Sequence, residues 1–348
     1  MKIVAATGAA LLVAGAAGWI GDRIGAPLPW LLGPLGVCAV VAMAGLHLGG
    51  VRPSLPLRAR AIFAPVIGVA IGSSVTPEVL GQASGWWPSL LAVGGFVIVV
   101  QLGNYALLRR LGGYDRPTAY FASSPGGLVD AVMLGELRSG DPAAMATQHF
   151  ARIALTVAAV PLLLAAAGLP TRGPMAAETV AAEVVDALIL LPIAVLGAVA
   201  GTRLRLPAAP LLGPLILSAA AHLAGLTDAA MPPALVHLAQ LVVGARLGLQ
   251  FAGVGGRDVA RGFALAALSV ALSLTVAAGL ALSLSPMVGV PVPAVFLAFA
   301  PGGVAEMGLI AVALGVEPAY VILHHLLRII ATITVLPQIY DRAILPRR

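Results

Sequence analysis

The sequence predicts an all-α membrane protein with about ten transmembrane helices and two re-entrant broken hairpins, arranged in two inverted repeats. Of its 348 residues, 60% are hydrophobic and only 10% are charged. Apolar runs recur from Ile3 to Tyr340, and roughly 20 such residues are enough for one helix to cross a bilayer core. Several sequence blocks also occur twice. These observations exclude a soluble globular class and indicate a duplicated membrane fold.

The polar connections leave no room for a soluble domain. The longest lie near Gly49 to Ala59 and Leu169 to Ala182, too short to fold independently as a catalytic or DNA-binding domain. The net charge of +6 comes from arginines in short loops, a pattern typical of membrane orientation rather than of nucleic-acid binding. We therefore expect the lipid bilayer as a partner and no nucleic acid. The single cysteine, Cys38, predicts a packed core thiol, without disulfides or a thiolate metal site.

The first apolar run resembles a signal peptide, since it follows Met1 and Lys2. A second copy of this run occupies Val184 to Gly201, deep within the chain. We therefore interpret it as the first transmembrane helix.

Two copies of one unit are expected at residues 1–172 and 173–348, because motifs return in the same order. Leu31-Leu32-Gly33-Pro34-Leu35 returns as Leu211-Leu212-Gly213-Pro214-Leu215, and Pro27 returns as Pro207. Pro125-Gly126-Gly127 with Asp130 returns 176 positions later as Pro301-Gly302-Gly303 with Glu306. The Leu-Leu-Gly-Pro-Leu block predicts a kink that lets helices pack closely, with substrate contact as the alternative.

The arginines indicate how the copies are oriented. Each copy holds six hydrophobic segments, and the fifth is interrupted by Pro-Gly-Gly. If that segment dips into the membrane and returns, the second copy is inverted. Nearly all loop arginines then lie on one side, with Arg23 and Arg172 opposite. The positive-inside rule favours this arrangement over six crossings per copy. It places both termini in the cytoplasm of a bacterial inner membrane.

The two Pro-Gly-Gly tips are the predicted substrate site. Glycine lets the backbone approach a ligand closely, and a helix that starts after it directs free N–H groups toward an anion. The residues expected to bind substrate there are Ser123, Ser124, Pro125, Gly126 and Gly127 in the first copy and Pro301, Gly302 and Gly303 in the second. The alternative is a tight turn whose glycines supply positive φ.

Charged residues accompany each tip. Asp130 and Glu306 lie in the first turn after the glycines, where a carboxylate either caps the helix or takes part in proton or sodium coupling. His149, Arg152 and Thr156 share one helix face, as do His325, Arg328 and Thr332. A membrane arginine needs a partner, so we expect an ion pair with Asp130 or Glu306, or a bidentate contact with a substrate carboxylate. His149 and His325 are grouped with the coupling or ion-pair residues. Gln101 and Asn104 are interpreted as interhelical contacts.

The paired Leu-Leu-Gly-Pro-Leu and Pro-Gly-Gly blocks resemble the AbrB-type bacterial membrane proteins, which are unrelated to the soluble DNA-binding AbrB. The resemblance covers essentially the whole chain, and members are described as ammonia monooxygenases or as regulators of gene expression. The six histidines lack the clustered pattern of a copper or iron site, so we expect neither an enzyme nor a metal site.

The leading functional prediction is a secondary transporter for a small anionic metabolite, coupled to H⁺ or Na⁺. The alternative is a membrane-embedded sensor or regulator that binds a ligand without carrying it. No cofactor is expected apart from a bound Na⁺ ion, and homodimer formation stays open.

Overall fold

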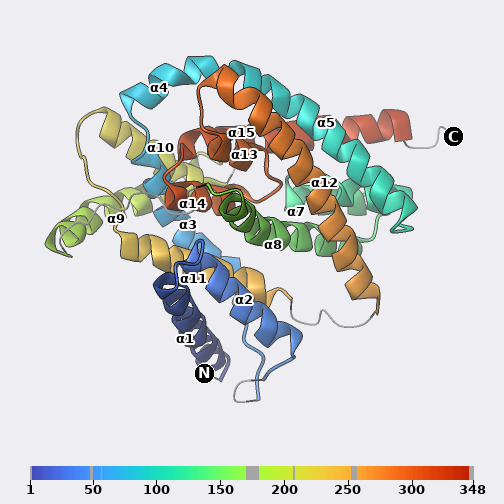
Figure 1. Ribbon diagram of the computed structural model, residues 1–348, viewed down its shortest axis with the longest axis horizontal. Coiled ribbons are helices and arrows are strands. Elements are labelled where there is room, and N and C mark those ends of the chain that lie inside the picture. The colour runs from blue at the N-terminus through green and yellow to red at the C-terminus, as the bar shows by residue number, and fades with distance from the viewer. Residues whose placement is uncertain are drawn as a thin grey trace. The chain divides into compact units, whose positions relative to one another are not determined.

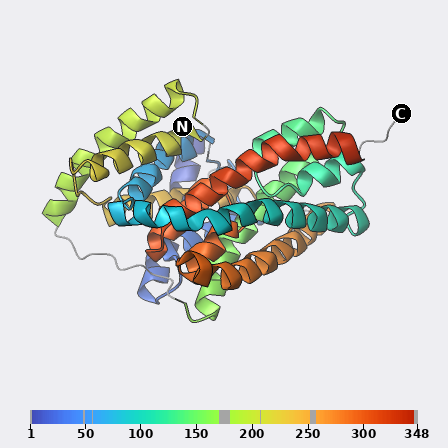
Figure 2. The ribbon, with the colours of Figure 1, turned by 90° about the horizontal axis from the view of Figure 1, so that it is seen from above.

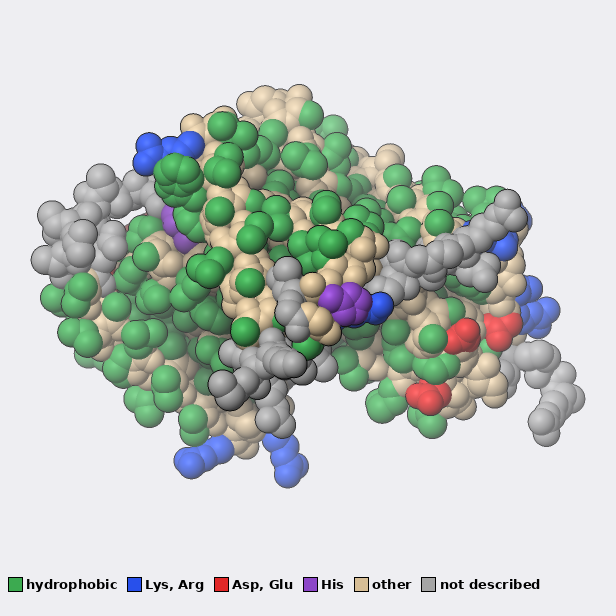
Figure 3. All heavy atoms as spheres, turned by 90° about the horizontal axis from the view of Figure 1, so that it is seen from below, with side chains coloured by type: hydrophobic (Ala, Val, Ile, Leu, Met, Phe, Trp, Pro, Cys, Tyr) green, Lys and Arg blue, Asp and Glu red, His purple; other side chains and the backbone are tan. Residues whose placement is uncertain are grey.

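The computed structural model describes residues 2–47, 50–55, 57–169, 180–206, 208–251 and 257–344, and every regular element within these ranges is a helix (Figure 1). The boundary between the predicted copies, Arg172, Pro207 and residues 252–256 lie outside the described residues. Hydrophobic side chains cover most of the face shown in Figure 3, and charged side chains are confined to a few places.

Within the described residues, six helical segments are long and apolar enough to cross a bilayer: Ala5–Arg23, Pro77–Arg110, Pro142–Ala166, Val184–Arg203, Ala260–Val288 and Pro318–Arg342. Shorter apolar helices at Pro29–Met43, Ile62–Gly72, Ala209–Leu223 and Pro233–Leu249 occupy the second and third predicted segments of each copy. The chain is therefore an all-α, multi-pass membrane protein.

The helices form two compact units, each built from both halves of the chain. Unit 1 comprises Met1–Ala83, Pro161–Val254 and Gly308–Ala319, and unit 2 comprises Ser84–Val160, Gly255–Met307 and Tyr320–Arg348. Matching segments of the two predicted copies therefore meet in the same unit. The two units in space therefore do not coincide with the two copies predicted from the sequence.

Unit 1 contains α1 (Lys2–Arg23), α2 (Pro29–Met43), α3 (Leu57–Gly72), α4 (Pro77–Ala83), α9 (Val180–Arg203), α10 (Ala209–Leu223) and α11 (Pro233–Leu249). The helices α2 and α10 begin alike: each follows a residue in the left-handed region, Leu28 at φ 40° and Ala208 at φ 48°. Each also has a proline in its first two positions, where the missing N–H costs nothing.

Glycines bring the unit 1 helices into close contact across the two copies. A Cβ atom on Gly68 of α3 would overlap the carbonyl oxygen of Leu211 in α10, and one on Gly244 of α11 would overlap that of Leu31 in α2. Within the first copy, Gly33 of α2 packs against the backbone of Ala17 in α1. Helices α2 with α11 and α3 with α10 are therefore reciprocal pairs, and the close packing predicted for the Leu-Leu-Gly-Pro-Leu block is confirmed.

Unit 2 contains η1 (Ser84–Trp86), α5 (Trp87–Arg110), α6 (Arg116–Ala122), α7 (Leu128–Glu136), most of α8 (Pro142–Ala166), α12 (Arg257–Val288), α13 (Val292–Phe299), the start of α14 (Val304–Leu314), α15 (Pro318–Ile339) and the π-helical turn η2 (Tyr340–Ile344). The long helices α5 and α12 pack side by side (Figure 2). Helix α13 packs against α12, and α6 packs against α5 and α7.

The helices α6 and α7 form a hairpin that returns to where it began. Asp115 caps α6 by accepting a 2.8 Å hydrogen bond from the Thr118 backbone N–H. The Thr118 hydroxyl in turn accepts one of 2.8 Å from the backbone N–H of Asp141, beyond the end of α7. The start and the end of the segment therefore meet, as expected of a re-entrant hairpin. In the second copy, α13 and α14 are joined at Pro301-Gly302-Gly303.

Candidate functional site

The helices α8 and α15 each direct a histidine and an arginine into the interior of unit 2. His149 and His325 are fully buried, and Arg152 and Arg328 are only 5% and 1% exposed. Thr156 and Thr332, one helical turn further on, are also buried. Because these residues are spaced i, i+3 and i+7, they lie along one face of each helix.

Arg328 holds the second tip. Its Nη1 donates to the Ala300 carbonyl oxygen at 2.6 Å, and its Nη2 donates to the Gly302 carbonyl oxygen at 2.8 Å. The same Nη2 lies 2.9 Å from Nδ1 of His325, whose Nε2 lies 2.9 Å from the Leu297 carbonyl oxygen. Since Nδ1 accepts from the guanidinium, His325 is neutral and donates through Nε2.

Arg152 holds the first tip in the equivalent way. Its Nη1 donates to the Ser124 carbonyl oxygen, and His149 Nε2 donates to the Phe121 carbonyl oxygen at 3.0 Å. All four residues lie 176 positions before their counterparts in the second copy. One arrangement of arginine, histidine and hairpin tip is therefore built twice within unit 2.

A carboxylate partner for the arginines stays a prediction, and the hydrogen bonds described for Arg152 and Arg328 go to backbone carbonyls and to His325. The reason is local. Where α6 and α13 end, their last carbonyls lack helical partners and carry the negative end of the helix dipole, which attracts a cation.

Both carboxylates lie over the tips instead. The Asp130 Oδ2 atom would be 3.5 Å from a Cβ atom on Gly127, and the Glu306 carboxylate occupies the place that a Cβ atom on Gly303 would take. Each acid lies in the first turn of the following helix, α7 or α14. This is the position of a capping carboxylate.

The tip glycines serve different local needs. Gly127 has φ 64°, a conformation that favours glycine, and forms the N-cap of α7. Gly302 is crowded by the side chain of Met307, which would lie 2.6 Å from a Cβ atom added at this glycine. Gly126 has ordinary space around it, with Ile329 and Thr332 at 3.5 and 3.6 Å from such a Cβ atom. Gly126 is therefore the tip glycine with the most space beside its α-carbon for an added side-chain atom.

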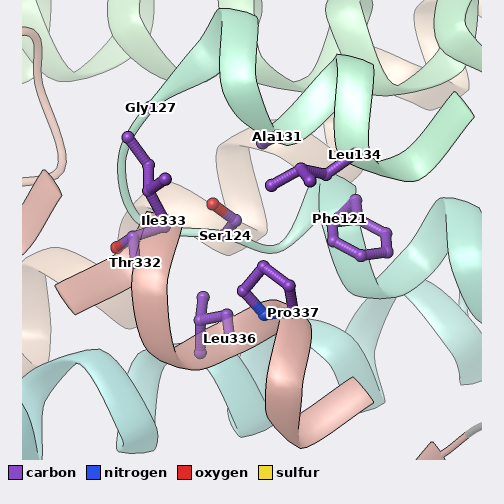
Figure 4. A pocket seen from close by; sticks show the side chains of 9 residues that line it. All are labelled: Phe121, Ser124, Gly127, Ala131, Leu134, Thr332, Ile333, Leu336 and Pro337. Carbon is purple, nitrogen blue, oxygen red and sulfur yellow. The ribbon is translucent and has the colours of Figure 1, made fainter. Parts of the chain in front are cut away.

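A small pocket opens between the first tip and α15 (Figure 4). Its lining comprises Phe121, Ser124, Gly127, Ala131, Leu134, Thr332, Ile333, Leu336 and Pro337. The lining includes two side-chain oxygen atoms, that of Ser124 from the first tip and that of Thr332 from α15. Its interior offers room of about 10 Å³ for the centre of a water-sized sphere, which is about enough for one water molecule. A larger solute would need the tip or α15 to move.

Several polar atoms around the tips are buried without a hydrogen-bond partner among the described residues. They are Arg152 Nε, Arg328 Nε, Thr156 Oγ and Thr332 Oγ, together with His149 Nδ1. Buried polar atoms are seldom left unpaired in native proteins. Two of the five are charged donors and two are hydroxyls, so the arrangement is suited to a solute that accepts hydrogen bonds.

The remaining tip residues have internal roles. Pro125 and Pro301 are buried at the two turns. The Ser124 hydroxyl donates to the Gly126 carbonyl oxygen at 2.8 Å, and the Ser123 hydroxyl donates to that of Tyr120 at 2.7 Å. Sequence reasoning gave no role to Tyr120, whose own hydroxyl donates to the Leu336 carbonyl oxygen at 2.8 Å. The sequence marks Tyr120 only as one of two neighbouring aromatic residues, with Phe121, ahead of the serines.

The comparison with known protein families agrees with the repeated motifs. A family model described as "Transition state regulatory protein AbrB" matches residues 43–343. The chain belongs to the AbrB family. The AbrB relative "Uncharacterized protein YhjN" of Bacillus subtilis (strain 168) is 26% identical, over 95% of this chain and 91% of its own. The "Putative regulator AbrB" of Escherichia coli (strain K12) is also 26% identical, over 90% and 89% of the two chains.

The AbrB assignment confirms the resemblance carried by the Leu-Leu-Gly-Pro-Leu and Pro-Gly-Gly blocks. The names of the two AbrB relatives describe an uncharacterised protein and a regulator, and neither names an enzyme. Both relatives match almost the full chain, so the matched region includes the hairpins of unit 2.

Proposed function

We propose that this AbrB-family member is a secondary transporter that binds a small anionic solute at the two hairpin tips. The observation that carries the proposal is the duplicated arginine arrangement: Arg152 and Arg328 lie buried in an apolar bundle, and each holds one tip. A charged side chain within a membrane is costly and is generally found where function requires it. An anion between the tips would offset both charges.

The hydrogen-bond donors without a described partner indicate the chemistry of the solute. The Nε of each arginine is such a donor, and Thr156 and Thr332 supply hydroxyls from the same two helices. The first N–H groups of α7 and α14 add the positive ends of two helix dipoles. A carboxylate or another small oxyanion accepts such hydrogen bonds, and charge-assisted bonds of this kind are about twice as strong as neutral ones.

Movement of the solute, rather than binding alone, is proposed because of the broken helices. Paired, interrupted helices from two inverted repeats are the usual build of a transport site that opens to either side in turn. H⁺ or Na⁺ is the proposed driving ion, with Asp130 and Glu306 as candidates for proton coupling besides their capping position. The name of the Escherichia coli relative favours one other function, regulation, in which the same site would bind a ligand without transporting it.

Binding is tested by a thermal-shift screen of small anions and their uncharged amides on the purified protein, because a ligand of the folded state raises its apparent stability. The matched variants are Thr332→Val and Thr334→Val, on the same helix. Thr332 is buried without a described partner, whereas Thr334 is exposed and bonds the Ile330 carbonyl. We expect roughly tenfold weaker anion binding in Thr332→Val, since one hydrogen bond is lost, and no change in Thr334→Val.

Transport is tested with the same anion in proteoliposomes under separate pH and sodium gradients. Uptake driven by one gradient supports the proposal, and Asp130→Asn or Glu306→Gln should change the gradient dependence if these acids carry protons. An anion that binds but is never taken up under any gradient would contradict transport and support the regulator.

A further inference from the structure

The pocket beside the first tip lies between the first hairpin and the end of α15. Phe121 of α6 lines it from one side, and Leu336 and Pro337 of α15 line it from the other (Figure 4). Because the pocket has room for about one water molecule, a larger solute can enter it only if these two elements separate. The contacts between them therefore control the size of the pocket.

The ring of Phe121, which is 2% exposed, lies between two neighbours from different elements. The guanidinium of Arg138 lies over the ring, 5.5 Å from its centroid, and the ring centroid of Tyr340 lies at 5.2 Å. Arg138 follows α7, and Tyr340 begins the turn η2 after α15. Phe121 is therefore held between the end of the hairpin and the end of the long helix.

An ion pair joins these two neighbours of Phe121. Arg138 Nε donates to Asp341 Oδ1 at 2.7 Å, and Arg138 Nη2 donates to Asp341 Oδ2 at 2.6 Å, which is the bidentate geometry of a strong pair. Arg138 Nη1 also donates to the Leu134 carbonyl oxygen of α7 at 3.0 Å. Since Asp341 directly follows Tyr340, the ion pair also fixes the position of the Tyr340 ring.

The ion pair is the weakest of the contacts between the hairpin and the end of α15. Its two side chains are 20% and 45% exposed, and exposed pairs shift an equilibrium by a factor of about five or less. The Tyr120 hydroxyl, in contrast, donates to the Leu336 carbonyl oxygen from a buried position. Separation therefore begins at Asp341 and not at Leu336.

A hinge is available between these two contacts. Helix α15 contains Pro337, whose missing N–H takes away the helical donor of the Ile333 carbonyl oxygen, so the helix bends most easily there. The π-helical turn η2 follows three residues later. This turn can therefore move away from the hairpin while Leu336 stays bonded to Tyr120.

We propose that Phe121 is a gate beside the first tip and that the Arg138–Asp341 ion pair holds it closed. When the pair breaks, η2 turns away about Pro337, the Phe121 ring loses both neighbours, and this wall of the pocket opens. That the gate admits the solute rests on the proposed function, whereas its opening does not.

The second hairpin lacks the residues for such a gate. The residue 176 positions after Phe121 is Leu297. The residue 176 positions after Arg138 is Leu314, so neither an aromatic wall nor a charge is present. The arginine distribution predicts a cytoplasmic position for Arg138. The gate therefore controls access to the first tip from the cytoplasm.

The test measures how often the gate opens, in the purified full-length protein without any solute. Ala131 lines the pocket and is 4% exposed, so an Ala131→Cys side chain in a Cys38→Ala background reacts with a maleimide only when the gate is open. We expect Asp341→Asn to raise the labelling rate about three- to fivefold, because the ion pair is lost. Glu136→Gln is the matched control, since it removes an exposed charge from the same hairpin, and it should leave the rate unchanged.

Two further measurements separate the gate from a general loosening of the fold. The reversed pair Arg138→Asp/Asp341→Arg should return the labelling rate to within about twofold of the parent, because the attraction is restored. Salt at about 1 M screens exposed charges, so it should raise the rate in the parent and leave the rate of Asp341→Asn unchanged.

The role of Phe121 is tested by combining variants. Phe121→Ala should raise the labelling rate by itself, and adding Asp341→Asn should raise it no further. A full additional increase in the double variant would show that Phe121 is not the gate, and equal rates in the parent and Asp341→Asn would overturn the role of the ion pair. Failure of anion binding in the earlier screen would contradict the proposed function and leave these labelling rates unaffected.

Discussion

The guanidinium of Arg328 shows how a single charged residue can organise a break in a membrane helix. It spans two carbonyls of one tip, on either side of Pro301, and is braced by His325. Arg152 makes one described bond to the matching carbonyl of the first tip. The two arginines therefore occupy equivalent positions, but Arg328 makes more of the described hydrogen bonds than Arg152 does.

This inequality predicts different stabilities for two matched variants. Arg328→Leu should lower the free energy of unfolding by roughly 3–5 kcal/mol, because two carbonyls and a histidine nitrogen lose a charged donor. Arg152→Leu should cost less, about 1–3 kcal/mol. Arg328→Lys is the control for charge, and it should restore only part of the loss because an ammonium cannot bridge two carbonyls in a fixed plane. Equal Tm losses in the two leucine variants would contradict this account.

Backbone conformation separates the two glycines of the first tip. Gly127→Ala should destabilise by about 1–2 kcal/mol, because φ 64° forces a Cβ atom against the following carbonyl. Gly126→Ala should change stability by less than about 0.5 kcal/mol, since its Cβ atom would meet neighbours at ordinary distances. Thermal unfolding of both variants measures the difference. A larger loss in Gly126→Ala would show that the tip adopts another conformation.

At the scale of helices, the reciprocal pairs of unit 1 depend on the absence of side chains at the crossing points. Gly68→Ala and Gly244→Ala should each destabilise by about 1–3 kcal/mol, because the added methyl overlaps a backbone carbonyl that cannot move aside. Gly36→Ala in α2 is the control, because no atom outside its own stretch of helix lies within 4 Å of its Cβ position. It should be neutral or slightly stabilising. Tolerance of alanine at both Gly68 and Gly244 would refute the close crossing.

For the whole molecule, the direction in which each copy crosses the membrane is the main prediction to test. The arginine distribution predicts that the segment from Gly255 to Arg261, which includes the start of α12, faces the cytoplasm and that the loop from Thr227 to Pro232 lies outside. Single cysteines introduced into these loops in a Cys38→Ala background, followed by labelling of intact cells with an impermeant reagent, measure it. Labelling of the Gly255 loop from outside, with a cytoplasmic N-terminus, would eliminate the inverted arrangement.

The sequence by itself determined the fold class, because an apolar composition and repeated runs of spanning length permit little else than a helical bundle in lipid. It also showed the repeated motifs and the positions of the Pro-Gly-Gly breaks. Matched residues such as Gly126 with Gly302 and Arg152 with Arg328 can be recognised by comparing the two halves of the sequence, without a structure.

Only the tertiary structure decided which groups meet. The sequence suggested carboxylate partners for Arg152 and Arg328, but the carbonyls that bind them belong to backbone and leave no mark on residue identity. It likewise gave no reason to connect Arg138 with Asp341, which lie 203 positions apart in the chain. Contacts between distant segments depend on how helices pack, and periodicity along one helix reports only which face is buried. Hence the elements could be predicted from the sequence, whereas the partners within each site could not.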